Sequence, residues 1–132
     1  MSTRSRIAIE LPNGKVKSIY CHNDGYLSHN GMLLEKHYTD RKKVNALIKL
    51  GDISSLAPEL KPTGPHSFNK PEYGVVVAYG RDRGELGVAA NTHKDSDEFL
   101  HGDIEEYGYL FTKEDTWVVV TYNNRTPAKI RF

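Results

Sequence analysis

The sequence predicts an α+β domain with a mostly antiparallel sheet of about six strands and two main helices packed on one side. Three observations predict this fold class. Apolar and polar residues alternate on both sides of Pro12-Asn13-Gly14, an amphipathic pattern runs from Thr39 to Gly51, and residues 105–132 contain three β-type segments. Because 132 residues suffice for one hydrophobic core, we expect a single domain over residues 1–132.

The first expected element is a β-hairpin. Ile7, Ile9 and Leu11 share one face of a strand, because strand side chains alternate with a period of two. Asn13-Gly14 tolerates the positive φ of a tight turn, and Val16 resumes the apolar pattern after it. The sequence therefore predicts two antiparallel strands at the start of the chain.

Two helices are expected next. A short one is predicted around residues 33–38, after the loop signals Asn23-Asp24-Gly25 and Asn30-Gly31. The second is clearer, because Thr39 suits the N-cap position and Gly51 suits the left-handed residue that ends a helix. Its apolar face consists of Val44, Leu47 and Ile48.

The second half of the chain begins with a long proline-rich connection from Asp52 to Tyr73. Loops of this length inside a domain are often functional. The apolar run from Tyr73 to Tyr79 predicts a strand that is buried on both faces. One or two helical turns are expected after a cap at Asp95 or Ser96, followed by a meander of three strands.

Charge and composition exclude several classes of protein. The 18 basic and 17 acidic residues give a net charge of +1, which argues against binding to DNA or RNA polymers. Cys21 is the only cysteine, and we expect it in the core rather than in catalysis. The six histidines match no metal-ligand spacing, so we expect no metal site and no cofactor. No segment is typical of a signal peptide or a membrane span, so we expect a cytoplasmic protein without a membrane partner.

The stretch YCHNDGY, Tyr20–Tyr26, gathers polar and aromatic side chains where a strand ends. Asn23 and Asp24 suit a turn in which Gly25 takes positive φ. That turn leaves the aromatic residues and His22 unexplained. Two interpretations stay open, a turn alone and a turn that also forms the rim of a binding site through His22, Asn23 and Tyr26.

The stretch VAYGRDRGELG, Val77–Gly87, combines an aromatic residue, two arginines and three glycines. Its glycines match neither the dinucleotide-binding fingerprint nor the P-loop. Its chemistry nevertheless suits an anion, because Arg81 or Arg83 can pair with phosphate and Tyr79 can stack on a base. The competing interpretation is a surface network of the two arginines around Asp82, which residue types alone favour.

Three stretches in this order resemble a known family. They are MSTRSRIAIELPNGKVKSIYCHNDGY from Met1, LLEKHYTDRKKVNALIKLGDISSL from Leu33, and AYGRDRGE from Ala78 with Asn91 after it. Together they resemble the phage-encoded Thoeris anti-defence sponges of the first described type. The resemblance extends from Met1 to about Asn91 and is weaker in the C-terminal strands.

The resemblance implies a protein that binds glycocyclic ADP-ribose, the signal made by TIR-domain enzymes, without degrading it. It also implies a homo-oligomer, dimer-based and up to a hexamer, in the host cytoplasm, and for some members a second pocket for cyclic di- or trinucleotides. Tyr79 and Asn91 correspond to the family's aromatic and asparagine ligand contacts, although the aromatic is Tyr rather than Phe. We expect a pocket where the arginine loop meets the Tyr20–Tyr26 stretch, formed by His22, Asn23, Tyr26, Tyr79, Arg81 or Arg83, and Asn91.

Two other functions are weighed against sequestration. A nucleotide-signal hydrolase would use His22 or His93 as a base, but the sequence shows no recognisable nucleophile or acid and base pair for it. An inhibitor would dock on a host defence protein through the connection from Asp52 to Tyr73. We therefore expect a binding protein rather than an enzyme.

Overall fold

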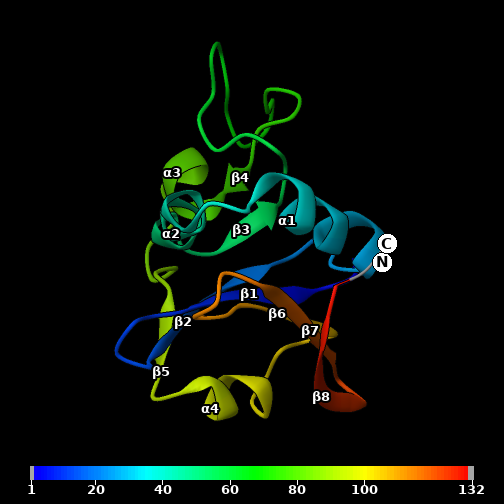
Figure 1. Cartoon of the computed structure of the whole chain (residues 1–132). Coiled ribbons are helices and arrows are strands. Elements are labelled where there is room, and N and C mark those ends of the chain that lie inside the picture. Colours follow the sequence, from blue (N-terminus) through cyan, green and yellow to red (C-terminus); the bar gives the residue numbers. More distant parts are fainter. Residues whose placement is uncertain (1, 131–132) are drawn as a thin grey trace.

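A mixed β-sheet runs through the middle of the molecule and separates two layers of helices and loops (Figure 1). The computed structural model describes residues 2–130. Within them the sheet has eight strands: β1 (Ser5–Glu10), β2 (Val16–Cys21), β3 (Ile53–Ser55), β4 (Val77–Ala78), β5 (Asn91–His93), β6 (Tyr107–Phe111), β7 (Trp117–Thr121) and β8 (Asn124–Lys129).

The strand order is β4-β3-β2-β1-β6-β7-β8, and β5 pairs with β2 beside β3. The predicted hairpin of β1 and β2 and the predicted meander of β6, β7 and β8 are confirmed. Most strand pairings in the described residues are antiparallel, as predicted, but the sheet is mixed, because β1 pairs with β6 and β2 pairs with β3 in parallel. It is also larger than predicted, since β3, β4 and β5 have only two or three residues each, too few to show a periodic pattern.

The predicted pair of helices, α1 (Met32–His37) and α2 (Arg41–Lys49), covers one face of the sheet (Figure 1). A π-helical turn, η1 (Leu27–Gly31), leads into α1. The short helix α4 (Ser96–Leu100) covers the opposite face and begins at Asp95, one of the two predicted caps. Helix α3 (Tyr79–Arg83) lies on the α2 side. Within residues 2–130, no helix has both the length and the apolar character needed to cross a membrane.

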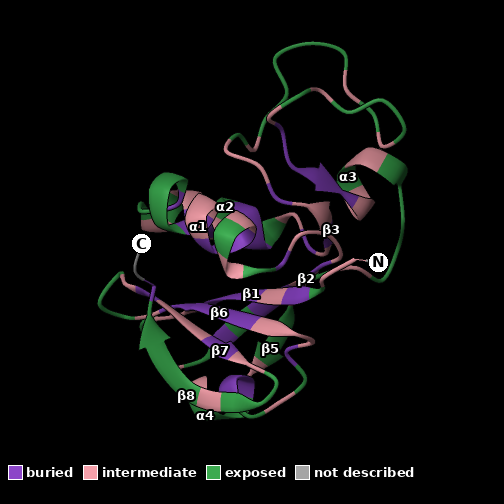
Figure 2. Ribbon diagram, turned by 90° about the vertical axis from the view of Figure 1, so that its right-hand side faces the viewer, coloured by how far each residue is buried: buried purple, intermediate pink, exposed green. Residues whose placement is uncertain are grey.

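The two faces of the sheet carry separate hydrophobic clusters (Figure 2). Side chains along β1 point alternately to the two faces of the sheet, and this alternation separates the two clusters. Ile7 and Ile9 pack with α1 and α2, whereas Ala8 packs with Phe99 of α4. Cys21 is fully buried in the larger cluster, as predicted, and burial raises the pKa of its thiol to about 11. This thiol is therefore a core group.

Two local predictions are corrected by the backbone. Helix α2 is capped by Asp40 rather than Thr39, because the Asp40 carboxylate accepts the backbone N–H of Lys42 at 3.2 Å. In the Tyr20–Tyr26 stretch the positive φ belongs to Asp24, at 56°, rather than to Gly25. Gly25 is needed for space instead, since a Cβ there would lie 2.7 Å from the Cβ of Ser5.

The predicted strand from Tyr73 to Tyr79 is largely wrong. Only Val77 and Ala78 form β4, and Val75 makes an isolated bridge to Glu59. The chain turns into α3 at Tyr79, so Arg81 and Arg83 lie on a helical turn instead of a loop. The connection between β3 and β4 rises above the body of the molecule as two arms (Figure 1).

Gly51 ends α2 as predicted, with φ at 78°, and allows a close backbone contact. A Cβ at this position would lie 2.3 Å from the carbonyl oxygen of Val88. That carbonyl accepts the backbone N–H of Asp52 at 2.8 Å, which holds the segment before β5 against the segment after α2. The absence of a side chain at Gly51 therefore allows the segment before β5 to contact the segment after α2.

We expect the substitution Gly51→Ala to destabilise the protein more than Gly74→Ala. Both glycines have positive φ, at 78° and 81°, and an alanine in that region costs about 1–2 kcal/mol. Nothing lies within 4 Å of a Cβ at Gly74, whereas Gly51→Ala adds a backbone clash of about 1–3 kcal/mol. Equilibrium unfolding in urea measures the difference, and equal losses of stability would contradict the close approach at Gly51.

Candidate functional site

Asp82 of α3 joins this helix to the connection between β3 and β4. Its side chain is only 5% exposed and accepts the backbone N–H of Ala78 at 2.8 Å. His66, in the connection, places Nε2 at 3.0 Å from Oδ2 of Asp82. The Nδ1 atom of His66 accepts the backbone N–H of Glu72 at 2.9 Å, so the ring proton lies on Nε2, beside Asp82. The His66–Asp82 contact has an ion-pair distance but a poorly aligned N–H.

Arg81 completes this network and holds three segments together. Its Nε donates to Oδ1 of Asp82 at 2.9 Å, and its guanidinium also donates to the carbonyl oxygens of Val76, at 2.6 Å, and Leu60. The guanidinium therefore has partners on α3, on the segment before β4 and in the connection. The structure places Arg81 in an internal crosslink around Asp82, which corresponds to the arginine–aspartate network considered from the sequence.

The electrostatics of Asp82 reflect this crosslink. Burial by itself raises the pKa of the carboxyl group, but hydrogen bonds from Arg81 and from the Ala78 N–H, together with the nearby His66 ring, outweigh burial and lower the pKa to about 2. The carboxylate is consequently ionised at neutral pH although it is almost inaccessible. We call the contacts of Asp82 with Ala78, Arg81 and His66 the Asp82 latch.

Arg83 and two aromatic rings form the adjacent surface, which we call the aromatic cluster: Phe68, Tyr79 and Arg83. The ring centroids of Phe68 and Tyr79 are 5.6 Å apart, and the guanidinium carbon of Arg83 lies 4.6 Å and 4.8 Å from them. The Arg83 side chain is 47% exposed and pairs with Glu85 at 3.0 Å. Arg83 thus presents an accessible cation beside two rings, whereas Arg81 is committed to the Asp82 latch.

The predicted residues of the Tyr20–Tyr26 stretch have different environments. Asn23 is held by Ser54, since its Nδ2 donates to the Ser54 carbonyl at 3.0 Å. Ser2 donates to Oδ1 of Asn23 at 2.8 Å, so both ends of this amide have protein partners. His22 bonds through Nδ1 to the Tyr20 hydroxyl at 2.7 Å, and Tyr26 is exposed with its ring 6.0 Å from that of His29.

Asn91 lies on β5, where its Cα is in register with Ser18 of β2. Cross-strand partners point to the same face of a sheet, so Asn91 shares the face on which Ser18 contacts His93. In Figure 1, β5 lies on the α4 side of the sheet and α3 lies on the other side. The structure therefore groups Tyr79 with Arg83 and Arg81 on α3, and it places Asn91 away from that group.

A Ser–His–Glu arrangement with a buried serine occurs on the α4 side. The Oγ atom of Ser18 is 2.8 Å from Nε2 of His93, and Nδ1 of His93 is 3.9 Å from Oε1 of Glu98. Burial and the nearby Arg6 lower the pKa of His93, which keeps the imidazole neutral at neutral pH. Ser18 has no exposed surface, and Nε of Arg6 donates to its Oγ at 3.2 Å. The order of residues resembles a nucleophile with its base, but the hydroxyl is closed to a substrate.

A cavity on the α1 side of the described structure has a volume of about 530 Å³. Residues 55–58 and 71–75 form its walls, together with Asp24, His29 and Leu33. None of the seven residues predicted as ligand contacts lines this cavity. Over residues 2–130, no group of three or more His, Cys, Asp or Glu side chains is placed to hold a metal ion.

Sequence reasoning missed His66 and Phe68, the two residues of the connection that reach α3. A signal for Phe68 was present, because it is the only non-proline apolar residue between Lys61 and Lys70. No local pattern identifies the partner of His66, since its contact with Asp82 joins distant parts of the chain. The cavity was missed for the same reason, as its walls come from separate segments.

We expect the Asp82 latch to make stability depend on pH in the acid range. The pKa of Asp82 is about 2 in the folded chain and 3.8 when unperturbed, so its ionised form stabilises folding above about pH 4. This contribution, about 2 kcal/mol, is lost as the pH falls from about 4 to about 2. Urea unfolding near pH 6 and near pH 2 should show a larger acid loss for the natural protein than for Asp82→Asn. A variant at an exposed acid, Glu85→Gln, is the control, and identical pH dependence in all three proteins would contradict the latch.

Comparisons with known proteins identify no family and no function for this chain. No family model, no curated protein and no solved structure matches the chain. The resemblance to the anti-defence sponges accordingly rests on the three sequence stretches and their order, and the function that follows from it is a proposal.

Proposed function

We propose that the protein binds a glycocyclic ADP-ribose signal and sequesters it without cleaving it. The observation that carries the proposal is the aromatic cluster, in which an accessible guanidinium lies within 5 Å of two rings. A cyclic ADP-ribose derivative needs a ring to stack on its base and a cation for its diphosphate. The cluster offers both within one small surface of α3 and the connection.

Arg83 is the arginine that suits a diphosphate in this proposal. Its pairing with Glu85 is a surface ion pair, and such pairs contribute about 0–1 kcal/mol. A diphosphate can therefore replace Glu85 as the partner of the guanidinium with little loss of free energy. The base of the ligand can then stack on the rings of Phe68 and Tyr79. Arg81 has no comparable freedom, because it donates to Val76, Leu60 and Asp82.

A second copy of the chain belongs to the same proposal. Asn91, the other ligand contact implied by the resemblance, is exposed on β5, and its register with Ser18 puts its side chain on the α4 face of the sheet, whereas α3 lies on the other side (Figure 1). A ligand held between protomers can contact the aromatic cluster of one copy and Asn91 of another. The resemblance supports a dimer-based homo-oligomer, up to a hexamer, acting in the host cytoplasm, and a further site for cyclic di- or trinucleotides.

Sequestration needs only tight binding and slow release, because free signal falls by mass action. The specific observation that favours a second candidate, a nucleotide hydrolase, is the contact between Ser18 and His93 at 2.8 Å. The burial of Ser18 argues against it, since a nucleophile must touch its substrate. Direct docking on a host defence protein is the third alternative, and the fully exposed Tyr73 on the connection is its support.

One experiment separates these functions. The protein is incubated with glycocyclic ADP-ribose, free ligand is measured, and the protein is then heat-denatured so that the bound material can be analysed. We expect depletion of free ligand and release of the intact molecule. A cleaved product that disappears with Ser18→Ala would establish the hydrolase, and an undiminished free ligand would favour docking on a host protein.

We expect Tyr79→Ala and Arg83→Ala to weaken binding of glycocyclic ADP-ribose in calorimetry. Loss of one stacking ring costs about 1–3 kcal/mol, which corresponds to about 5- to 150-fold in the dissociation constant. The matched control is Lys61→Ala, which removes an exposed positive charge from the same connection. Arg81→Ala should instead lower the free energy of unfolding. Unchanged affinity in both the Tyr79 and Arg83 variants would remove the aromatic cluster as the ligand site.

A further inference from the structure

The cavity of about 530 Å³ lies between the two ends of the connection and the Tyr20–Tyr26 stretch, apart from the aromatic cluster. Its volume is in the range of about 300–1,000 Å³ that small-molecule sites occupy. Apolar side chains form most of the wall, chiefly Leu33, Leu56, Pro58, Pro71 and Val75. Such walls can pack against a flat apolar part of a ligand. The polar groups of the wall then determine which charged or polar group the ligand can carry.

Asp24 is the first of these polar groups. Its backbone has a φ of 56°, in the left-handed region that few residues other than glycine adopt. Within residues 2–130 no hydrogen bond or ion pair engages its carboxylate, although its backbone carbonyl accepts the N–H of Asn30 at 3.3 Å. A carboxylate without a protein partner at a cavity wall can accept a hydrogen bond from a ligand.

The wall also contains the Ser55 hydroxyl, which can donate or accept, and the ring of His29, which accepts. Asn30 donates through Nδ2 to Ser5 and Cys21, so its Oδ1 faces Nδ1 of His29 at 3.0 Å. This contact fixes the ring proton on Nδ1 and leaves Nε2 of His29 as an acceptor. Glu72 adds a negative charge, because hydrogen bonds from Gly64 and Thr63 lower the pKa of its carboxyl group.

Positive charge is missing from the cavity wall within the described residues. No lysine or arginine lines it, and the nearby Lys43 is committed to the Pro58 carbonyl at 2.7 Å and the Tyr38 ring. A phosphate or carboxylate ligand would face Asp24 and Glu72 without a partner, which is unfavourable. The wall therefore selects against anions and in favour of donors.

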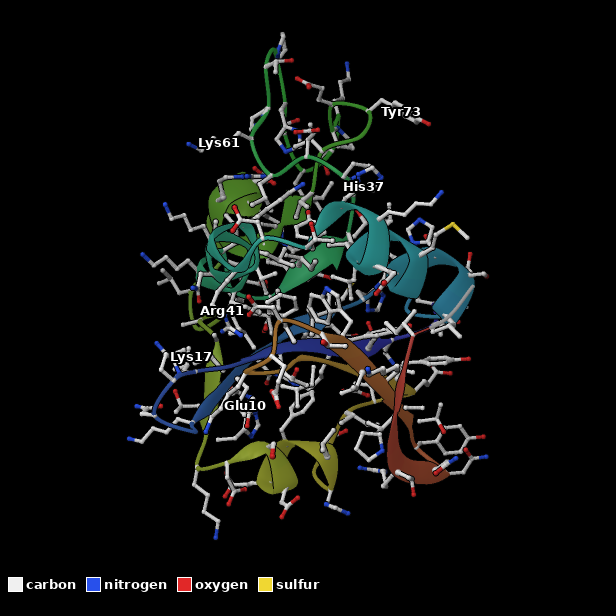
Figure 3. The ribbon with its side chains drawn as sticks, viewed as in Figure 1. Glu10, Lys17, His37, Arg41, Lys61 and Tyr73 are labelled. Atoms are coloured by element: carbon white, nitrogen blue, oxygen red, sulfur yellow. The ribbon has the colours of Figure 1, made fainter. Side chains whose placement is uncertain are left out.

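We propose that this cavity binds a small organic cation, an ammonium or amidinium group carried on a flat apolar body. The cationic group donates to Asp24 and His29, and the apolar body packs on the leucine and proline walls. Tyr73 stands at the rim, fully exposed and pointing away from the body of the molecule (Figure 3). The neighbouring Gly74, with φ at 81° and open space around it, lets this ring fold over a bound cation. This site is independent of the aromatic cluster and of the sequestration proposal.

The test uses three ligands that share one ring system. Tryptamine carries an ammonium group, tryptophol a neutral hydroxyl in its place, and indole-3-acetate a carboxylate. Titration of the ¹⁵N-labelled protein, followed by amide chemical shifts, measures their affinities and maps the site. We expect saturable binding of tryptamine with shifts at residues 24–33 and 55–58, binding of tryptophol weaker by about tenfold or more, and no binding of indole-3-acetate.

The variant Asp24→Asn removes the charge and keeps the backbone conformation, since asparagine tolerates positive φ. We expect it to weaken tryptamine by about tenfold or more and to abolish the difference between tryptamine and tryptophol. The control Asp97→Asn removes an exposed carboxylate on α4, far along the chain, and should change neither affinity. The proposal is overturned if tryptamine does not saturate, if indole-3-acetate binds equally well, or if Asp24→Asn binds tryptamine as the natural protein does.

Discussion

The contacts of the Asp82 carboxylate hold helix α3 and the connection between β3 and β4 together, and the rest of this region depends on them. The carboxylate accepts hydrogen bonds from the backbone at the start of α3 and from Arg81, and it contacts His66 of the connection at 3.0 Å. Arg81 extends the network to Leu60 and Val76. The bridge between Glu59 and Val75 joins the two ends of the connection to each other, whereas the contacts of Asp82 and Arg81 join the connection to α3.

The two arginines of α3, Arg81 and Arg83, consequently have different roles. Arg81 belongs to the latch, and Arg83, two residues further along the same turn, is left at the surface beside Phe68 and Tyr79. The ring of Phe68 reaches Tyr79 because His66, two residues before it, is fixed on Asp82. The proposed ligand surface is thus a product of the latch. Its chemistry suits a nucleotide diphosphate, whereas the cavity beside Asp24 has the opposite charge and suits a cation.

Sequence patterns predicted the elements whose structure depends on residues close together in the chain. The hairpin of β1 and β2, the apolar face of α2 and its end at Gly51 follow from strand and helix periods and from backbone preference. The parallel pairing of β1 with β6 joins residues about 100 apart, and no periodicity encodes it. For the site, residue chemistry singled out Tyr79 and Arg83, and the structure places these two side chains together. Residue chemistry did not find Phe68, because that contact depends on how the connection folds back over α3.

The central claim is that Asp82 holds the connection on α3 and thereby forms the aromatic cluster. The most direct measurement is the nuclear Overhauser effect between the ring protons of Phe68 and Tyr79, whose centroids are 5.6 Å apart. We predict cross-peaks between the two rings in the natural protein and in Glu85→Gln, and their loss in Asp82→Asn while the core resonances are unchanged. Cross-peaks that persist in Asp82→Asn, or that are missing from the natural protein, would contradict the claim.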